Sequence, residues 1–350
     1  MNAKKWNYIV IGCTFGALLL LALITIVIDP FLHYHDGLLG LQYPLKDERY
    51  QNDGIARHYD YDGIITGTSM CQNFKPSEFD ALWGGKTVKL THSGASFCES
   101  RSTIKRALDY QPEIKYVLCS LDGTMVNYPA NQNTYDGYPE YFYDENPFND
   151  VNYFLNKEVL PKTVAVLNYT RAGNKTTSMD EYGFWGAYKS YGKETVLASF
   201  TLVEEHEEEY ALSETDKEQI TENVTENLLK LALDNPDVTF YLFFPPYSVC
   251  FWEALERTNQ LELQIEAQKI ATEILLEADN IEVYDFSLMT DITGNLDNYT
   301  DTLHYGPWIN SEILIMINEK TGLLTKENYD KHWSEVQSVY QYYDYSMYKK

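Results

Sequence analysis

The chain has 350 residues, of which 44% are hydrophobic, so a sizeable folded core is expected and general disorder is excluded. Its 27 basic and 52 acidic residues give a formal net charge of −25 at pH 7. Such a charge repels phosphate backbones, and nucleic acid is therefore excluded as an expected partner.

An uncharged apolar segment, residues 9–28, is the first predicted element. As a helix, a segment of about 20 apolar residues crosses a hydrocarbon core of about 30 Å. Lys4 and Lys5 precede the segment, and basic residues before a span favour a cytoplasmic N-terminus. We therefore expect residues 1–8 in the cytoplasm, a transmembrane anchor at 9–28, and the bulk of the chain outside the cell membrane.

A cleaved signal peptide is the competing interpretation of this segment. The apolar region of a signal peptide is usually shorter and ends at a cleavage site with small residues two positions apart. The sequence Ile-Val-Ile-Asp-Pro at residues 26–30 offers no such site. An uncleaved anchor is therefore favoured.

Strand-like and helix-like segments alternate through most of the remaining chain. Residues 29–60 contain several glycines and prolines and predict a linker. Short apolar runs then predict strands, and apolar residues at helical spacing predict helices between them. The predicted strands are 61–67, 87–90, 116–121, 238–244 and 281–286, and the predicted helices are 100–110, 217–233, 261–276 and 308–320. Such alternation predicts a three-layer α/β/α sandwich with a central parallel sheet over residues 61–323.

Two segments do not follow the alternating pattern. Residues 124–212 are rich in Tyr, Asn, Asp and Gly and are too long for a connecting loop. They predict either a lid or substrate-binding insertion, or an acidic excursion on the surface. Residues 324–350 form a tyrosine-rich C-terminal tail without a functional interpretation.

Ser69 is the candidate nucleophile, because it follows the first predicted strand in the sequence Gly67-Thr68-Ser69-Met70. A serine hydroxyl attacks poorly near neutral pH unless a base removes its proton. A strand-to-helix turn presents the hydroxyl at the edge of the sheet and directs backbone N–H groups at a developing oxyanion. The alternative is that Thr68 or Ser69 only caps the next helix.

Asp301 and His304 are the candidate partners of Ser69, and they lie just before the last predicted helix. A spacing of three residues would place both side chains on one face of a helical turn. The carboxylate can then hold the imidazole in the tautomer that accepts the serine proton. Ser69, Asp301 and His304 are therefore the predicted catalytic triad.

These motifs give the chain a resemblance to the SGNH/GDSL hydrolase family. The resemblance covers about residues 61–323, with further similarity at residues 29–35, and is greatest to the membrane-anchored bacterial branch that includes the D-alanine transfer protein and alginate acetylation proteins. The segment around Ser69 looks like the family's first block, which carries the nucleophile. Ser93-Gly94-Ala95-Ser96 looks like the second, so Gly94 would donate an N–H to the oxyanion. Asp301-Thr302-Leu303-His304 looks like the last block.

This chain departs from the family's usual pattern in the third block. The family usually has an Asn there as a further oxyanion donor, whereas this sequence has Leu121-Asp122-Gly123. An ionised Asp122 cannot donate a hydrogen bond. Asn127 or a backbone N–H would have to replace it, so the expected oxyanion hole consists of Ser69, Gly94 and Asn127.

The cysteines suggest a further link between the two loops beside the nucleophile. Cys71 and Cys98 each follow a candidate site residue by a few positions. If the two strand ends are neighbours, a Cys71–Cys98 disulfide could join the loops; two buried thiols are the alternative. No cysteine or histidine spacing resembles a zinc site, and neither a metal nor an organic cofactor is expected.

The resemblance implies an extracytoplasmic esterase or O-acyltransferase that acts on acyl esters of a cell-surface polysaccharide or wall polymer. A membrane O-acyltransferase would be a further partner. A non-catalytic protein that binds glycans or scaffolds an export complex on the same fold is the alternative. A chance combination of the three residues on another α/β fold would separate Ser69 from His304 in space.

Overall fold

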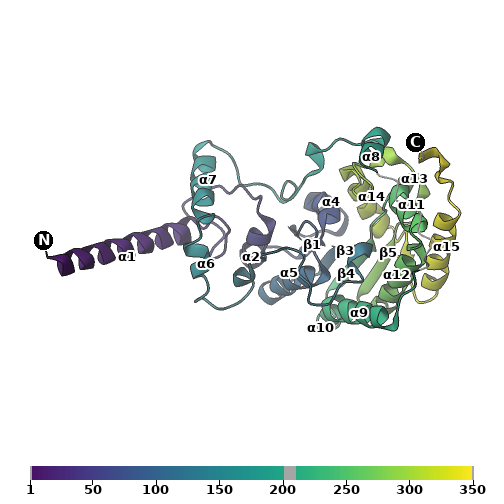
Figure 1. The fold of residues 1–350 in the computed structure, drawn as a ribbon, viewed down its shortest axis with the longest axis horizontal. Helices are drawn as coiled ribbons and strands as arrows, with labels where there is room; N and C mark the ends of the chain where they lie inside the picture. The colour runs from purple at the N-terminus through teal and green to yellow at the C-terminus, as the bar shows by residue number, and fades with distance from the viewer. Residues whose placement is uncertain (1, 201–209, 349–350) are drawn as a thin grey trace. The chain divides into compact units, whose positions relative to one another are not determined.

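The computed structural model describes residues 2–200 and 210–348, and the chain divides into two compact units (Figure 1). Unit 1 comprises Met1–Tyr59 and Gly137–Ser178, and unit 2 comprises Asp60–Asp136 and Met179–Lys350. The predicted insertion at 124–212 is therefore divided, since only its middle part belongs to unit 1.

A six-stranded sheet of order β2-β1-β3-β4-β5-β6 forms the centre of unit 2. Its strands are β1 (Gly63–Gly67), β2 (Thr87–Thr91), β3 (Tyr116–Ser120), β4 (Thr239–Phe244), β5 (Ile281–Asp285) and β6 (Leu323–Leu324). The first five strands run parallel, and β6 is antiparallel to β5. The mostly parallel sheet confirms the mixed α/β class, and the antiparallel edge strand is an addition that the sequence pattern did not predict.

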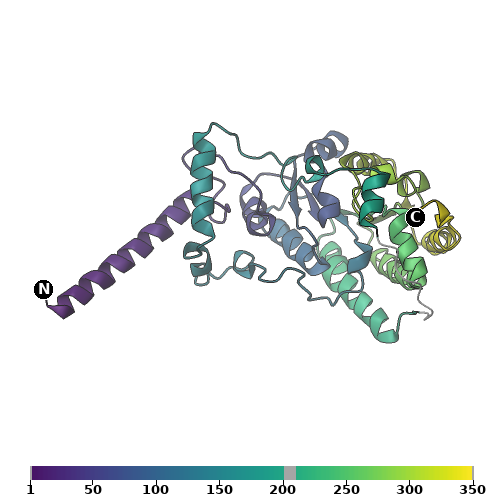
Figure 2. The same cartoon turned by 45° about the horizontal axis from the view of Figure 1, so that its top comes forward.

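Helices flank the sheet on both sides (Figures 1 and 2). On one side α4 (Pro76–Trp83) packs against α14 (Pro307–Asn318). On the other side α9 (Glu214–Val224) contacts both α5 (Phe97–Tyr110) and α12 (Leu261–Leu275). Because both faces are covered, the strands are buried almost throughout, as expected for apolar runs in a parallel sheet.

The C-terminal segment is part of unit 2 and is not the separate tail that was predicted. Helix α15 (Tyr329–Gln341) packs against α12 and against α11 (Val249–Arg257). Trp333 is fully buried, and its indole N–H donates to the Thr272 hydroxyl at 3.1 Å. Nε2 of His332 lies 2.8 Å from Oδ2 of Asp285, at the end of β5. These contacts are made by single residues of a mainly polar segment, so the segment has no apolar periodicity from which its packing could be predicted.

Unit 1 contains α1 (Ala3–Ile28), α2 (Glu48–His58), α6 (Val151–Phe154) and α7 (Val159–Arg171). The predicted linker at 29–60 was wrong, because this segment folds against the second part of the unit. Its apolar cluster joins Phe31 to Phe142, Tyr153 and Val159, which come more than 100 positions later in the chain. The core partners of residues 29–60 are therefore too distant in sequence to be recognised from local composition.

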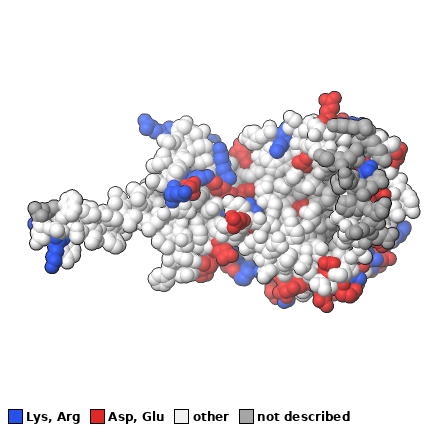
Figure 3. Space-filling view, viewed as in Figure 1, with Lys and Arg blue, Asp and Glu red and all other residues white. Residues whose placement is uncertain are grey.

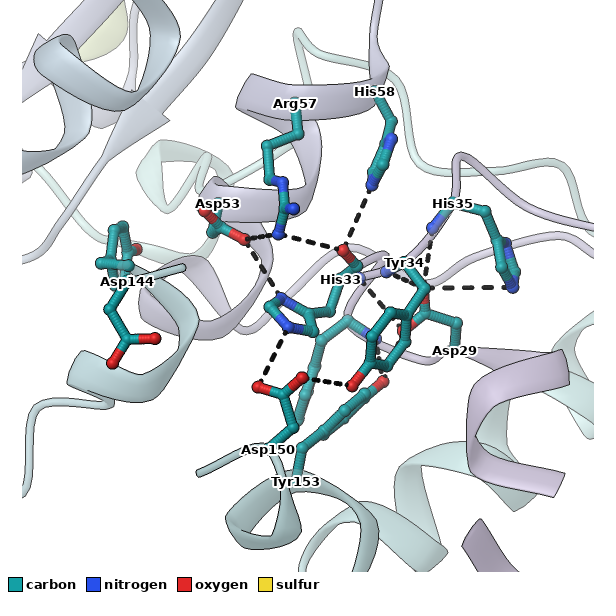
Figure 4. A network of polar contacts seen from close by, with 12 residues as sticks. Asp29, His33, Tyr34, His35, Asp53, Arg57, His58, Asp144, Asp150 and Tyr153 are labelled. Atoms are coloured by element: carbon teal, nitrogen blue, oxygen red, sulfur yellow. Dashed lines mark hydrogen bonds and ion pairs between the residues drawn. The ribbon is translucent and has the colours of Figure 1, made fainter. Parts of the chain in front are cut away.

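A buried polar network fixes the turn that follows α1 (Figure 4). The Asp29 carboxylate accepts hydrogen bonds of 2.7 to 3.1 Å from the backbone N–H groups of residues 33–35 and from the Tyr153 hydroxyl. Burial raises the pKa of Asp29, although these donors oppose the rise. Nδ1 of His33 lies 3.2 Å from Oδ2 of Asp53 on α2. The network ties the end of α1 to both α2 and α6.

Helix α1 is 26 residues long and is long and apolar enough to cross a membrane. Its apolar side chains are mostly exposed, whereas Thr25 and Ile28 near its C-terminal end are buried within unit 1. The packed part of unit 1 therefore begins at the last turn of this helix.

Candidate active site

Ser69, His304 and Asp301 form a continuous chain of hydrogen bonds. Ser69 is the first residue of α3 (Ser69–Gln72), directly beyond β1. Its Oγ lies 2.8 Å from Nε2 of His304, and Nδ1 of His304 lies 2.9 Å from Oδ2 of Asp301. Because Nδ1 faces a carboxylate, it carries the ring proton, which leaves Nε2 to accept the hydrogen bond of the Ser69 hydroxyl. This geometry permits the imidazole to act as the base for a serine nucleophile.

The segment that carries Asp301 and His304 is a bend and not the helical turn expected from their spacing. It lies between Tyr299 and Tyr305, which form an isolated antiparallel bridge. Oδ1 of Asp301 accepts the backbone N–H groups of Leu303 at 2.9 Å and His304 at 2.8 Å. The carboxylate thus folds the bend around itself and brings the imidazole into contact without a helix.

Asp301 is held in its ionised form. Partial burial alone would raise the pKa of its carboxyl, but the hydrogen bond and charge of His304 and the backbone N–H donors outweigh this effect. The pKa of Asp301 is therefore below its usual value of 3.8. An ionised carboxylate at neutral pH stabilises the imidazolium that forms when His304 takes a proton.

The position of Ser69 depends on the two residues before it. Gly67 has a φ of +113°, and a Cβ at this position would lie 2.5 Å from Oγ of Ser120 on β3. The Thr68 hydroxyl accepts the backbone N–H of Met70 at 3.2 Å and caps α3. Capping and presentation of the serine are therefore not exclusive, since Thr68 caps the short helix while Ser69 faces His304.

Gly94 lies beyond the end of the neighbouring strand. Gly67 pairs with Thr91 in the parallel register of β1 and β2, and the His92 N–H donates to the Gly67 carbonyl at 2.9 Å. Gly94 follows with a φ of +66°. Within residues 2–200 and 210–348, the N–H groups of Ser69 and Gly94 donate no hydrogen bond. Both N–H groups are therefore free donors in the described part of the chain.

Asp122, which follows β3, is buried and contacts the residue before Ser69. Its carboxyl accepts hydrogen bonds from the hydroxyls of Thr68 and Tyr247. Burial raises the pKa of Asp122, and the two hydroxyl donors and the nearby His304 oppose this rise. Asp122 therefore supports the loop that carries Ser69.

Asn127 is bonded to α9 through its backbone. Its backbone carbonyl accepts a hydrogen bond of 2.7 Å from the Gln219 side chain on α9. Its side-chain oxygen is buried and has no hydrogen-bond partner in the described part of the chain. The described residues show no hydrogen bond between Asn127 and Ser69, and Asn127 stays a predicted oxyanion donor.

Trp185 is a site residue that the sequence reasoning missed. Its indole N–H donates to the Ser69 carbonyl at 3.0 Å, and its ring meets the His304 ring edge to face with centroids 5.5 Å apart. The backbone N–H groups of Trp185 and Gly186 donate to Oδ1 of Asn73, at the end of α3. Trp185 lies within the predicted insertion, and only the aromatic content of that segment hinted at such a role.

Two further aromatic residues lie near the triad. The rings of Tyr191 and Trp308 meet with centroids 4.9 Å apart, and the Tyr191 hydroxyl donates to the Gly186 carbonyl at 3.0 Å. Burial, together with the Asp301 charge, raises the pKa of Tyr191 to about 12. Trp308 is 46% exposed and is available for contact with a bound molecule.

The predicted disulfide between Cys71 and Cys98 is absent, because both residues are free thiols. Cys71 is fully buried at the β1–β3 side of α3, whereas Cys98 lies on α5 beside Arg101. Burial raises the pKa of Cys71 to about 12, so its thiol is unreactive in the folded chain. Among the described residues, no group of three or more His, Cys, Asp or Glu side chains could hold a metal ion.

No family model and no curated protein matches the chain. Among solved structures, it is similar to "The structure of a putative platelet activating factor from Streptococcus pneumonia". The sequence identity is 11%, the match covers 78% of this chain and 89% of that chain, and the TM-score is 0.39. At this level of similarity, no activity can be transferred from that structure.

Proposed function

We propose that this protein is a serine esterase or O-acyltransferase of the SGNH/GDSL type. The observation that carries the proposal is the hydrogen-bonded chain from Ser69 through His304 to Asp301. Ser69 follows β1 and Asp122 follows β3, where the order of strands along the sheet reverses. Open α/β sheets bind their ligands at the carboxyl ends of the strands at such a point.

The strand order supports the assignment of unit 2 to a three-layer α/β/α sandwich. The order β2-β1-β3-β4-β5 is the flavodoxin-like order of doubly wound sheets. Together with helices on both sides, it favours a three-layer α/β/α sandwich of the SGNH type, to which β6 adds an antiparallel edge.

In the proposed reaction, His304 takes the proton of Ser69 through Nε2 as Oγ attacks an ester carbonyl. Asp301 stabilises the resulting imidazolium, and the N–H groups of Ser69 and Gly94 bind the oxyanion. Collapse of the tetrahedral intermediate breaks the ester bond, and His304 returns the proton to the leaving alcohol. Water or a sugar hydroxyl then attacks the acyl-enzyme with His304 as base, so the products are a free acid or a new ester.

We assign the substrate to the acyl esters of a cell-surface polysaccharide or wall polymer. The aromatic rings of Trp185, Tyr191 and Trp308 near the triad are consistent with this assignment, because Trp and Tyr present apolar faces with polar edges. A membrane O-acyltransferase would supply the acyl group if a sugar hydroxyl is the acceptor.

The proposed location is the outer side of the cell membrane. Helix α1 would cross the membrane once. Lys4 and Lys5 at its start favour a cytoplasmic N-terminus, which leaves the site of Ser69 outside.

A non-catalytic glycan-binding or scaffolding protein is the second candidate, and Asp122 favours it. This buried carboxyl follows β3, where SGNH/GDSL enzymes usually carry an Asn that donates to the oxyanion. Loss of one oxyanion donor costs about 2.7–4 kcal/mol of transition-state stabilisation.

A fluorophosphonate probe distinguishes the two candidates. We expect the full chain in detergent micelles to be labelled, and Ser69→Ala to abolish labelling. Ser102→Ala is the matched control, because its hydroxyl donates to the Cys98 carbonyl on α5 and takes no part in the triad. Absence of labelling in the folded wild-type chain would overturn the enzyme proposal and favour the glycan-binding protein.

A further inference from the structure

The free apolar length of α1 is shorter than a bilayer core. Its C-terminal end becomes buried in unit 1 at Thr25 and Ile28, so the apolar helix that is free of other protein runs from about residue 9 to residue 24. At 1.5 Å per residue this is roughly 24 Å, whereas a hydrocarbon core is about 30 Å thick. Trp6 and Tyr8 are aromatic residues of the type found at the membrane interface. If α1 spans the membrane, its free apolar part is roughly 6 Å shorter than the hydrocarbon core. This missing length lies at the end of α1 where unit 1 begins.

Two helices of unit 1 contact α1 at that end. Both α6 and α7 pack against α1, and α7 runs across its C-terminal end in two views (Figures 1 and 2). A helix that crosses the end of a membrane-spanning helix lies approximately parallel to the membrane surface.

Helix α7 and its neighbourhood carry an exposed apolar stripe. Leu160, Val164 and Leu167 follow helical spacing on α7 and are 47%, 48% and 44% exposed. The stripe lies beside the face of α7 that buries Val159, Thr163 and Val166. Exposed apolar side chains also occur on and near α6, namely Phe148, Val151 and Leu155. A stripe of this kind on a helix lying across the membrane normal is typical of an interfacial amphipathic helix.

The charge of this region differs from that of the whole chain. Residues 151–178 contain four basic residues and one acidic residue, although the chain carries a net charge of −25. Arg171 and Lys175 are exposed near the end of the stripe. In the space-filling view the surface along α1 is largely uncharged, while acidic side chains gather on unit 2 (Figure 3). Basic residues beside an apolar stripe favour contact with anionic lipid headgroups.

We infer that the apolar stripe of α6 and α7 inserts into the lipid interface of the membrane that α1 crosses. Insertion of amphipathic helices to a depth of about 5–10 Å matches the missing length of the span. The occupant of the stripe is therefore lipid, and unit 1 is a second point of membrane attachment beside α1. This inference rests on the proposed anchoring by α1.

Single cysteine labels with an environment-sensitive fluorophore test the inference on the full chain, after replacement of Cys13 and Cys98. The protein is reconstituted in vesicles of phosphatidylcholine and phosphatidylglycerol. Leu160→Cys and Val164→Cys report on the stripe, and Ala165→Cys is the matched control on another side of α7. Leu19→Cys reports on α1. We expect lipids with a shallow spin-label quencher to quench positions 160 and 164 several-fold more than position 165.

Each other outcome has a separate meaning. Labels at 160 and 164 as accessible to water as the label at 165, with position 19 inside the bilayer, would overturn the inference and leave the anchor intact. Labels at 160 and 164 shielded from both lipid and aqueous quenchers would show a contact with a second copy of the chain instead of lipid, and would also overturn it. A label at position 19 that is exposed to water would reject the anchor itself.

Discussion

Thr68, the residue before the proposed nucleophile, donates its hydroxyl hydrogen bond to the buried carboxyl of Asp122 at the end of β3. Tyr247 donates to the other carboxyl oxygen. The loop that presents Ser69 is thus attached to the next strand of the sheet through an acidic residue. An Asn at this position keeps the size of the side chain but has one acceptor oxygen, so one of the two hydroxyls would have to accept a hydrogen bond from its NH2 group.

Asp122→Asn is expected to change how stability depends on pH. Because burial raises the pKa of Asp122, its carboxyl is protonated more readily in the folded chain than in the unfolded chain, where the pKa is near 3.8. The wild-type chain therefore loses stability as the pH rises from 3.8 through the raised folded pKa. The variant does not titrate there. The unfolding free energy of the variant relative to the wild type should therefore increase over this window. The increase is about 1.4 kcal/mol for each unit by which the folded pKa of Asp122 exceeds the unfolded pKa.

Chemical denaturation between pH 4 and pH 7 measures this effect. Tryptophan fluorescence reports on unit 2, because all tryptophans except Trp6 lie in that unit. A difference between variant and wild type that stays constant or shrinks with rising pH would contradict the prediction.

Asp301→Asn is expected to reduce the rate of the proposed Ser69 acylation by about 10⁴-fold, the size of the effect in known serine triads. The amide of Asn can accept or donate, so it no longer holds the proton on Nδ1 of His304, and Nε2 loses its fixed acceptor role. The rate of fluorophosphonate labelling measures the effect. A variant that reacts within tenfold of the wild type would show that Asp301 does not control the imidazole.

The same carboxyl gives an expected loss of stability in acid. Because the pKa of Asp301 is lowered in the folded chain, its stabilising contribution is present above the unfolded value of 3.8. The contribution is lost as the pH falls through the lower folded pKa. The difference in unfolding free energy between the wild type and Asp301→Asn should therefore become smaller as the pH falls below about 4.

Gly67→Ala and Gly94→Ala should differ in stability although both glycines have positive φ. Adoption of positive φ by alanine costs about 1–2 kcal/mol, which both variants incur. At Gly67 the added Cβ would also lie 2.5 Å from Oγ of Ser120, whereas at Gly94 nothing lies within 4 Å. Overpacking adds about 1–3 kcal/mol, so Gly67→Ala should have the lower unfolding free energy. Equal denaturation midpoints would contradict this reading.

Trp185→Phe should slow the acylation of Ser69 by about fivefold, since a net hydrogen bond is worth about 1 kcal/mol. The variant keeps a ring next to His304 but removes the N–H that holds the Ser69 carbonyl. Trp83→Phe is the control, because its indole N–H donates to the Tyr241 hydroxyl instead. If both variants label at the wild-type rate, the Trp185 contact does not position the nucleophile.

The sequence predicted the parallel strands and the larger helices of unit 2 because each has a continuous or periodic apolar pattern. Strand β6 has only two residues, Leu323–Leu324, and its pairing depends on β5. Such a short strand leaves no periodic signal. The fold of residues 29–60 was missed because Phe31 and Asp29 find their partners beyond residue 140.

The candidate site could be predicted at the level of residues but not of local structure. Ser69, Asp301 and His304 stand in recognisable short motifs, and the structure brings them together. The bend around Asp301 and the engagement of Asn127 with α9 depend on backbone contacts that spacing does not encode. Trp185 reaches Ser69 from 116 positions away, and no motif marks it.

The two-residue strand β6 has a consequence for association between molecules. It pairs with β5 at Val283 and Tyr284 and makes the edge strand of the sheet only two residues long. Long exposed edges are templates for pairing with other chains. Truncation of the chain before Leu323 would remove the partner of Val283 and Tyr284 and leave β5 as a longer edge strand, so β6 limits edge-to-edge aggregation.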